Sequence, residues 1–221
     1  MKLKIIKQLK NFQGQRALLR LDLNVAVPVK GKLGAEDNLR LLKVLPTIKY
    51  LVQHQAAVII VAHLGRPQGK VVKSLSLKPV TDYLAKLSGR RIDFWQKNIS
   101  ECVKSSKQMA PGQVAMLENI RFYPGEEADS PAFSKQLSCL ADIYVNDAFG
   151  NIHRASASML GVTKYLPSYA GLLLAEEVDK LNKIFQTKRG LMVVLGGAKI
   201  STKISLIKKF IKSADQVLRS E

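Results

Sequence analysis

The feature that most constrains the fold of this chain is a regular alternation of short apolar runs with longer amphipathic segments. The clearest run is Val58-Ile59-Ile60-Val61, which contains no polar position and leads directly into a turn. A strand that is apolar at every position is covered on both faces, which is typical of a parallel sheet flanked by helices. The segments expected to form strands are residues 16–25, 57–62, 91–95, 113–117 and 142–146, and those expected to form helices are residues 38–53, 77–88 and 131–140. Pro46 is expected to bend or interrupt the first helix. The sequence therefore predicts an α/β fold with helices on both faces of a parallel sheet.

A different unit begins near residue 170. Residues 171–187 have the pattern of a long amphipathic helix, and its apolar face is expected to contain Leu172, Leu173, Val178, Leu181 and Ile184. Residues 191–195 form a further apolar run, a stripe of isoleucines across residues 200–211 indicates a helix, and residues 215–218 look like the start of another strand. These pieces bury too little apolar surface to close a core. We therefore expect residues 190–221 to be an incomplete unit that is mobile or prone to self-association.

The net charge of the 221-residue chain is +18, which raises nucleic-acid binding as one alternative. The lysines are dispersed, except from Lys199 to Lys212, where their spacing fits the solvated face of an amphipathic helix. The sequence has no basic patch interleaved with aromatic residues and no base-reading motif. A solvated basic surface that attracts small anions is the simpler account, and we expect no nucleic-acid partner.

Signals for export or membrane insertion are not seen in the sequence. The first residues alternate lysine with apolar residues, and no stretch approaches the roughly 18 consecutive apolar residues of a membrane span. Cys102 and Cys139 lie far apart, without a CxxC or Cys/His metal spacing. We expect two buried or partly buried free thiols, a cytoplasmic protein and no membrane partner.

Polar side chains follow the first expected strand directly, at the edge of an open α/β sheet where ligands bind. Asp22 and Asn24 alternate along the end of that strand, so both side chains can point to the same side and bind hydroxyl groups. Taken as an isolated pair, they are more often residues that make hydrogen bonds within turns and caps.

The second expected strand leads into His63-Leu64-Gly65-Arg66-Pro67. Gly65 keeps the turn open, Pro67 restricts it, and Arg66 offers a guanidinium fork that suits carboxylate or phosphate. His63 is either a structural residue at the end of the strand or a further donor to the same ligand.

Further arginines follow the later strands. Arg121 comes after the strand at 113–117, Arg154 comes after the strand at 142–146, and Arg40 lies early in the first helix. Each arginine alone is typical of a surface salt bridge. Together they predict a rim that binds a small polyanion, because each charge-assisted hydrogen bond contributes about 1.5–3 kcal/mol.

The segment Gly196-Gly197-Ala198-Lys199 joins an apolar strand to the start of an expected helix. Unpaired backbone N–H groups and the helix dipole favour phosphate at such a place. Lys203 lies one turn after Lys199 on the same face. The spacing is not that of a Walker A motif, and a tight strand-to-helix turn explains the segment equally well.

Taken in order along the chain, these segments resemble the motifs of the phosphoglycerate kinase family. The matching segments are residues 20–25, 62–67, 117–122, 145–155 and 196–200, and the resemblance covers essentially the whole chain. It implies a Rossmann-like sheet of the type found in the N-terminal domain of that family. Residues 1–170 would then be a phosphoglycerate-binding domain, residues 171–189 an interdomain helix, and residues 190–221 the incomplete start of a nucleotide-binding domain, so that the chain is truncated.

The resemblance also implies a set of site residues. The phosphoglycerate site would comprise Asp22, Leu23, Asn24, Arg40, His63, Leu64, Gly65, Arg66, Arg121 and Arg154. Gly197, Lys199 and Lys203 match the family's motif for nucleotide phosphates, and Arg40, Arg154 and Lys199 would neutralise charge on the phosphoryl group in flight. The implied glycolytic reaction transfers phosphoryl between 1,3-bisphosphoglycerate and ADP, or in reverse from Mg-ATP to 3-phosphoglycerate. The Mg site is expected in the half that is missing here, so no metal site is expected in this chain.

The chain departs from the family pattern in three places. Ala26 and Val27 form a two-residue insertion in the loop that leads to Arg40, and Ser156 stands where many members carry histidine or glutamine. The glycine-rich turn, glutamate and late Gly-Gly-Gly-Asp segment of the family's second domain are not present. We therefore expect phosphoglycerate binding with negligible turnover by this polypeptide alone. The alternative is a non-catalytic binding half that needs a second chain. Family members are monomers, and self-association here would involve residues 190–221.

Overall fold

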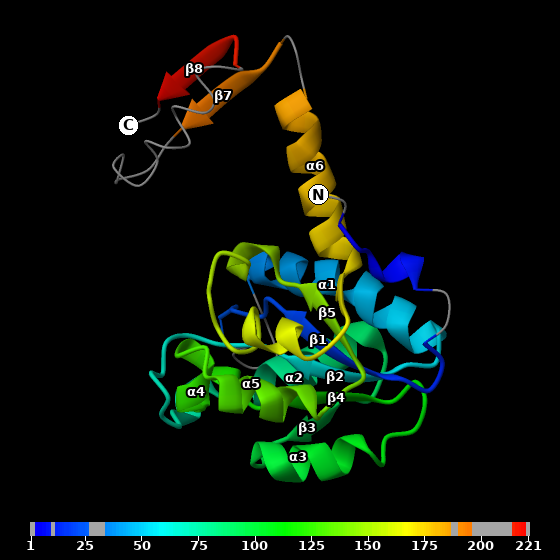
Figure 1. The fold of residues 1–221 in the computed structure, drawn as a ribbon. Coiled ribbons are helices and arrows are strands. Elements are labelled where there is room, and N and C mark those ends of the chain that lie inside the picture. The colour runs from blue at the N-terminus through cyan, green and yellow to red at the C-terminus, as the bar shows by residue number, and fades with distance from the viewer. Residues whose placement is uncertain (1–2, 10–11, 27–33, 187–189, 196–213, 220–221) are drawn as a thin grey trace. The chain divides into compact units, whose positions relative to one another are not determined.

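The computed structural model describes residues 3–9, 12–26, 34–186, 190–195 and 214–219. The chain forms two compact units, Met1–Ala175 and Glu176–Glu221. The first unit contains a six-stranded sheet, in which β1 lies near the middle (Figure 1). Its strands are β1 (Arg16–Leu21), β2 (Ala57–Val61), β3 (Asp93–Trp95), β4 (Val114–Leu117), β5 (Ile143–Asp147) and β6 (Ser168–Ala170). They lie in the order β3-β4-β2-β1-β5-β6, and every neighbouring pair is parallel. The predicted parallel α/β fold is confirmed.

Alternate residues of the central strands pack into two cores, one on each face of the sheet. In β2, Val58 and Ile60 belong to the first core, whereas Ile59 and Val61 belong to the second. Leu18 of β1 belongs to the second core. Because both faces of these strands are covered, apolar residues occupy nearly every position, which is the pattern that the sequence shows.

Helices cover both faces of the sheet. The first core is completed by α1 (Ala35–Gln53) and α2 (Lys78–Ser88), and the second by α3 (Ile99–Ser106) and α5 (Pro131–Ser138). The remaining short elements of this unit are α4 (Pro124–Glu127) and 3-10 helices at Ile6–Gln8, Lys73–Leu75, Ile120–Phe122, Phe149–Asn151 and Gly161–Lys164. Within the described residues, no helix has the length and apolar character needed to cross a membrane.

Several expected element boundaries change for physical reasons. The expected strand at 16–25 ends at Leu21, because Asp22 accepts a hydrogen bond from the Asn24 backbone N–H (3.3 Å) and turns the chain. The helix α1 continues through Pro46, so Pro46 does not interrupt it, and the alternative of a bend there stays a prediction. Neighbouring Leu45 and Ile48 are buried in the first core, and this packing compensates for the hydrogen bond that a proline removes. The elements α3 and β6 were not expected from the sequence.

One of the two thiols differs from the expectation. Both cysteines are free, and Cys102 is buried, which raises the pKa of its thiol to about 11. Cys139, expected to be buried or partly buried, is exposed. It follows the last turn of α5, whose buried side is formed by Phe133 and Leu137, and it lies on the outer side of that turn.

Two side chains of the first unit hold the start of α6 (Leu172–Gln186). The Asp147 carboxylate accepts a hydrogen bond from the Leu174 backbone N–H (2.9 Å), and the Thr47 hydroxyl accepts one from the Leu172 backbone N–H (3.0 Å). These bonds satisfy N–H groups that a helix start leaves unpaired. Leu181 and Ile184, which belong to the expected apolar face of this helix, are each 38% exposed.

The second unit contains a parallel pair of strands, β7 (Met192–Leu195) and β8 (Gln216–Arg219). Met192, Val194 and Leu218 are 56%, 62% and 49% exposed. The helix expected at 200–211 lies outside the described residues. The expected mobility and self-association of this unit stay predictions.

The hydroxyl of Tyr144 provides a test of the second core. Tyr144 is 1% exposed, and its hydroxyl donates to the Ser158 backbone carbonyl (2.7 Å). We expect Tyr144→Phe to lower the free energy of unfolding by about 1–3 kcal/mol, because it leaves a buried carbonyl unpaired. Tyr165→Phe is the control, since Tyr165 is 43% exposed. Urea unfolding curves of the two variants would contradict this account if their midpoints were equal.

Candidate functional site

The candidate site lies at the carboxyl edge of the sheet, where the loops after β1, β2, β4 and β5 begin. Because all four strands are parallel and adjacent, their ends reach the same edge. Hydrogen bonds join the loops. The Asn24 side-chain oxygen accepts from the Gly65 backbone N–H (2.9 Å), and the Arg121 guanidinium donates to the Gly65 carbonyl (2.6 Å). Gly65 thus links the loops after β1, β2 and β4.

Backbone geometry explains why a glycine occupies position 65. Gly65 has φ +61°, a left-handed conformation that side chains disfavour. A Cβ atom there would also lie 2.8 Å from Cδ2 of Leu75. The conformation of the loop after β2 therefore favours a residue without a side chain at this position.

The Asn119 side chain joins the loops after β2 and β4. Its side-chain oxygen accepts from the backbone N–H groups of Leu64 (3.3 Å) and Arg121 (3.1 Å). Its amide donates to the carbonyls of Leu64 (2.7 Å) and Leu75 (2.9 Å). Asn119 lies within the motif at residues 117–122, and no role was predicted for it. It uses all of its hydrogen-bonding capacity on the loop backbone and is a structural clamp.

The loops after β1 and β5 also meet. Arg40 donates to the Asn24 backbone carbonyl (2.9 Å) and lies 3.9 Å from the Asp22 carboxylate. The other Asp22 oxygen faces the backbone of Gly150, where a Cβ atom would be 3.1 Å away. The insertion at Ala26 therefore does not remove Arg40 from the site, although residues 27–33 lie outside the described part of the chain.

A buried network that the sequence analysis missed lies beneath these loops. Arg20 is 2% exposed, and its guanidinium contacts Ser158 Oγ (3.0 Å) and His63 Nδ1 (2.9 Å). Ser158 in turn donates to Glu126 (2.6 Å), which is also 2% exposed. Buried charges are tolerated when they are hydrogen-bonded and face opposite charge. A lone arginine inside an apolar strand was the sequence signal that could have revealed such a network.

Three arginines dominate the electrostatics of the site. Burial is the main cause that lowers the pKa of Arg20 and of Arg121, and repulsion from Arg154 lowers both further. Glu126 and Glu127 oppose this effect. Burial followed by the fields of Arg20, Arg121 and Arg154 lowers the pKa of His63 to about 2. His63 is therefore neutral, and the positive charge of the site comes from the arginines.

Two donors in the loop after β5 lack acceptors. Arg154 Nε and Asn151 Nδ2 are buried, and neither has a hydrogen-bond partner among the described residues. A buried donor without a partner costs about 1–3 kcal/mol.

Other predicted site residues differ in exposure. Arg66 is exposed at the surface of the loop after β2. Leu23 and Leu64 are buried, so they contribute backbone rather than side chain to this edge.

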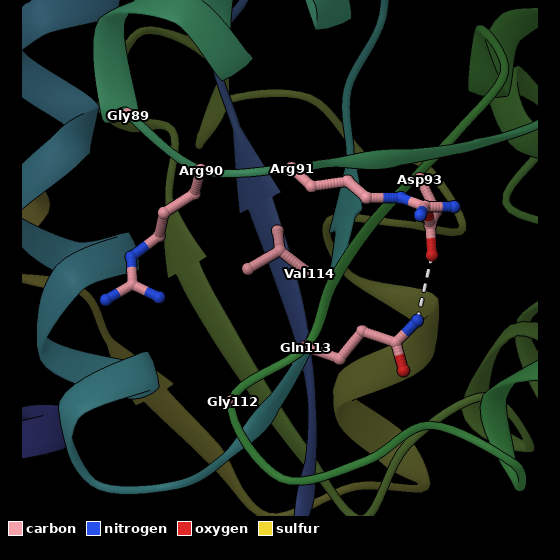
Figure 2. A pocket seen from close by; sticks show the side chains of 7 residues that line it. All are labelled: Gly89, Arg90, Arg91, Asp93, Gly112, Gln113 and Val114. Atoms are coloured by element: carbon pink, nitrogen blue, oxygen red, sulfur yellow. Dashed lines mark hydrogen bonds and ion pairs between the residues drawn. The ribbon is translucent and has the colours of Figure 1, made fainter.

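The hollow shown in Figure 2 lies at the opposite edge of the sheet. It has a volume of about 510 Å³ and is lined where β3 and β4 begin, by Gly89, Arg90, Arg91, Asp93, Gly112, Gln113 and Val114. Asp93 accepts from Arg91 (2.7 Å) and from Gln113 (2.8 Å). We place the candidate site at the carboxyl edge, because the polar side chains of this hollow are largely paired with one another.

The residues expected to bind nucleotide phosphates are not among those that the structure describes. Gly197, Lys199 and Lys203 lie outside the described residues. Within the described part of the chain, no group of three or more His, Cys, Asp and Glu side chains could hold a metal ion.

The neutrality of His63 predicts a pH dependence of stability. In an unfolded chain the pKa of histidine is about 6.5, whereas in the fold that of His63 is about 2. Because the folded pKa is lowered, the stabilisation is complete above the unfolded pKa and declines as pH falls below it. We expect this residue to contribute a slope of up to about 1.4 kcal/mol per pH unit between pH 6 and 5.

Denaturant unfolding at several pH values would measure this slope. His63→Gln should reduce this slope by the amount that corresponds to about one bound proton. The control His153→Gln should leave the slope unchanged, since the His153 side chain is exposed. Equal slopes for the parent chain and His63→Gln would show that His63 is not held neutral by the fold.

Comparison with known proteins gives the family of the chain. The profile of the phosphoglycerate kinase family matches residues 6–220. Phosphoglycerate kinase of Desulforudis audaxviator is 45% identical over 210 residues, which cover 94% of this chain and 53% of that protein. That of Moorella thermoacetica is 44% identical over 213 residues, which cover 94% and 52%.

Solved structures agree. Phosphoglycerate kinase from Coxiella burnetii superposes with a TM-score of 0.84 at 35% identity, over 99% of this chain and 54% of that one. The enzyme from Pyrococcus horikoshii gives a TM-score of 0.86 at 29% identity, over 99% and 55%. The chain spans about half the length of the relatives that it matches. On these matches, and on the order of its motifs, the chain belongs to the phosphoglycerate kinase family.

Proposed function

We propose that the carboxyl edge of the sheet binds 3-phosphoglycerate and 1,3-bisphosphoglycerate. The protein to which this chain belongs then transfers phosphoryl between 1,3-bisphosphoglycerate and ADP, as the family name implies. On this proposal residues 1–170 hold the phosphoglycerate, residues 171–189 form the connecting helix, and residues 190–221 begin the nucleotide-binding part.

The observation that carries the proposal is the unpaired donor of Arg154. Arg154 Nε is buried without an acceptor among the described residues, although it lies in the field of Arg20 and Arg121. Like charges close together repel, and a buried donor without an acceptor is costly. An anion with several oxygens relieves both penalties at once, so the arrangement supports a polyanionic ligand.

The proposed roles follow the chemistry of each side chain. Asp22 and Asn24 orient the hydroxyl of the ligand, and the exposed Arg66 offers a bidentate fork to its charged end. Arg121 is 6% exposed and is committed to the Gly65 carbonyl and to Glu127 (3.2 Å), so it mainly fixes the loop and adds charge. Arg40 and Arg154 stabilise charge on the phosphoryl group.

The resemblance, rather than the structure, supports the nucleotide side of the proposal. Gly197, Lys199 and Lys203 would contact nucleotide phosphates, with Lys199 adding charge to the transferred group. Magnesium bound with the nucleotide supplies further charge neutralisation in reactions of this kind. The catalytic contribution of the described residues is positioning and electrostatic stabilisation of the phosphoglycerate.

Calorimetric titration of 3-phosphoglycerate tests the binding site. We expect Arg66→Ala and Arg154→Ala to weaken binding by about tenfold or more each, the loss expected for a charge-assisted hydrogen bond. Arg91→Ala is the control, because Arg91 is 90% exposed at the opposite edge and pairs with Asp93. No heat at millimolar ligand, or equal affinity in all three variants, would refute the site.

A coupled assay tests whether this polypeptide turns over substrate. We expect no turnover near the 1–100 s⁻¹ that is roughly typical of kinases, because a nucleotide-binding part must close over the ligand to exclude water. The chain spans only about half of its relatives. Turnover within about tenfold of that range would show that these 221 residues suffice.

A further inference from the structure

We propose that Arg20 is a positioning residue, which fixes the proton of His63 on Nε2 and makes this neutral ring a hydrogen-bond donor toward the anionic ligand. This inference rests on the proposed function for the identity of the ligand. The tautomer of His63 and the role of Arg20 are inferred from the contacts of these two residues.

Each nitrogen of the Arg20 guanidinium has a partner inside the protein. Its Nε donates to Ser158 Oγ (3.0 Å), one terminal nitrogen donates to the Leu21 backbone carbonyl, and the other contacts His63 Nδ1 (2.9 Å). Arg20 is 2% exposed. With a protein partner on each of its three nitrogens, Arg20 is poorly placed to bind a ligand directly. Its effect on a ligand has to pass through a neighbour.

The contact between Arg20 and His63 determines the tautomer of the histidine. A guanidinium has only donors and stays protonated in proteins. At 2.9 Å, His63 Nδ1 must therefore accept, which it can do only if it carries no proton. The proton of the neutral ring then lies on Nε2. His63 is 2% exposed, and Nε2 is not among the buried atoms without a partner in the described residues.

A second layer of contacts prevents Arg20 from releasing the ring. Ser158 donates to Glu126 through its hydroxyl (2.6 Å) and through its backbone N–H (2.9 Å). The Ser156 hydroxyl also donates to Glu126 (2.9 Å). The carboxylate thus fixes the residue that accepts from Arg20 Nε. Because the guanidinium is planar, fixing Nε also fixes the nitrogen that faces His63.

The charge around His63 favours the same state. The cationic groups that face it are Arg20, Arg121 and Arg154, and burial acts in the same direction. A second proton on the ring would place a fourth positive charge in this cluster. His63 therefore donates through Nε2 without adding charge, and the choice of donor atom follows from Arg20.

Nitrogen NMR of the ligand-free chain tests the tautomer directly. In protein labelled with ¹⁵N at histidine, we expect His63 to show the Nε2–H form at every pH from about 5.5 to 8, a range that includes the ordinary histidine pKa. The signal is assigned by its loss in His63→Gln. An Nδ1–H form, or a ring that gains a second proton in this range, overturns the inference.

The variant Arg20→Gln tests the cause. A glutamine can accept as well as donate, so Nδ1 is no longer forced to stay unprotonated. We expect His63 in this variant to gain a proton on Nδ1 at pH 5.5, as the other tautomer or as imidazolium, and 3-phosphoglycerate to bind about tenfold more weakly or worse. Arg91→Gln is the control and should change neither quantity, because Arg91 lies at the opposite edge.

The two measurements separate this inference from the proposed function. If Nδ1 stays unprotonated in Arg20→Gln, Arg20 acts only through its charge and the inference is overturned, whatever happens to affinity. If the unmutated chain binds no 3-phosphoglycerate, the proposed function fails, and the role of His63 toward that ligand fails with it. The tautomer in the ligand-free chain still decides whether Arg20 orients the ring. Should Arg20→Gln not fold, the spectrum of the unmutated chain remains the deciding measurement.

Discussion

The arrangement of the candidate site depends on one buried charge, the guanidinium of Arg20. It is buried beside β5, where Ser158 accepts from Arg20 through its hydroxyl and from the buried Tyr144 through its carbonyl. A charge in such a place is tolerated only with good hydrogen-bonding geometry and opposite charge nearby. Glu126 supplies that charge and Ser158 supplies an acceptor, although they lie more than a hundred residues further along the chain. The hydrogen bonds and the opposite charge that stabilise the Arg20 guanidinium therefore join α4 and the segment after β5 to the end of β1.

The hydrogen bonds around Arg20 also help to fix the loops that form the candidate site. Because Ser158 is held by Glu126, the segment that directly follows Arg154 is tied to α4. Asn119 and Gly65 connect the remaining loops through backbone hydrogen bonds. The exposed Arg66 and Arg40 then lie on a base whose own polar groups are mostly satisfied. On the proposed function, such pre-ordered loops would favour binding, because less conformational freedom is lost when the ligand binds.

The sequence predicts the strands well where burial on both faces imposes an apolar pattern. The run at Val58–Val61 matches β2 to within one residue, since every one of its positions is buried. The helix α3 was missed because it is short and mostly polar, although Asn98 caps it by accepting from the Glu101 backbone N–H (2.9 Å). The strand β6 has only three residues, and no local pattern marks it. It forms because it pairs with β5.

The sequence indicates which residue types lie at the candidate site, but it does not indicate which of the arginines are buried and which are exposed. Motif order places Arg20, Arg66, Arg121 and Arg154 near one edge, yet nothing local distinguishes a buried cation from an exposed one. That distinction arises from partners distant in sequence, such as Glu126 for Arg20 and the Gly65 carbonyl for Arg121. Ser156 shows the same limit: at this departure from the family pattern its hydroxyl donates to Glu126 and reinforces the support of Arg20. Long-range hydrogen bonds, rather than local pattern, decide which of these cations are buried and paired and which are exposed.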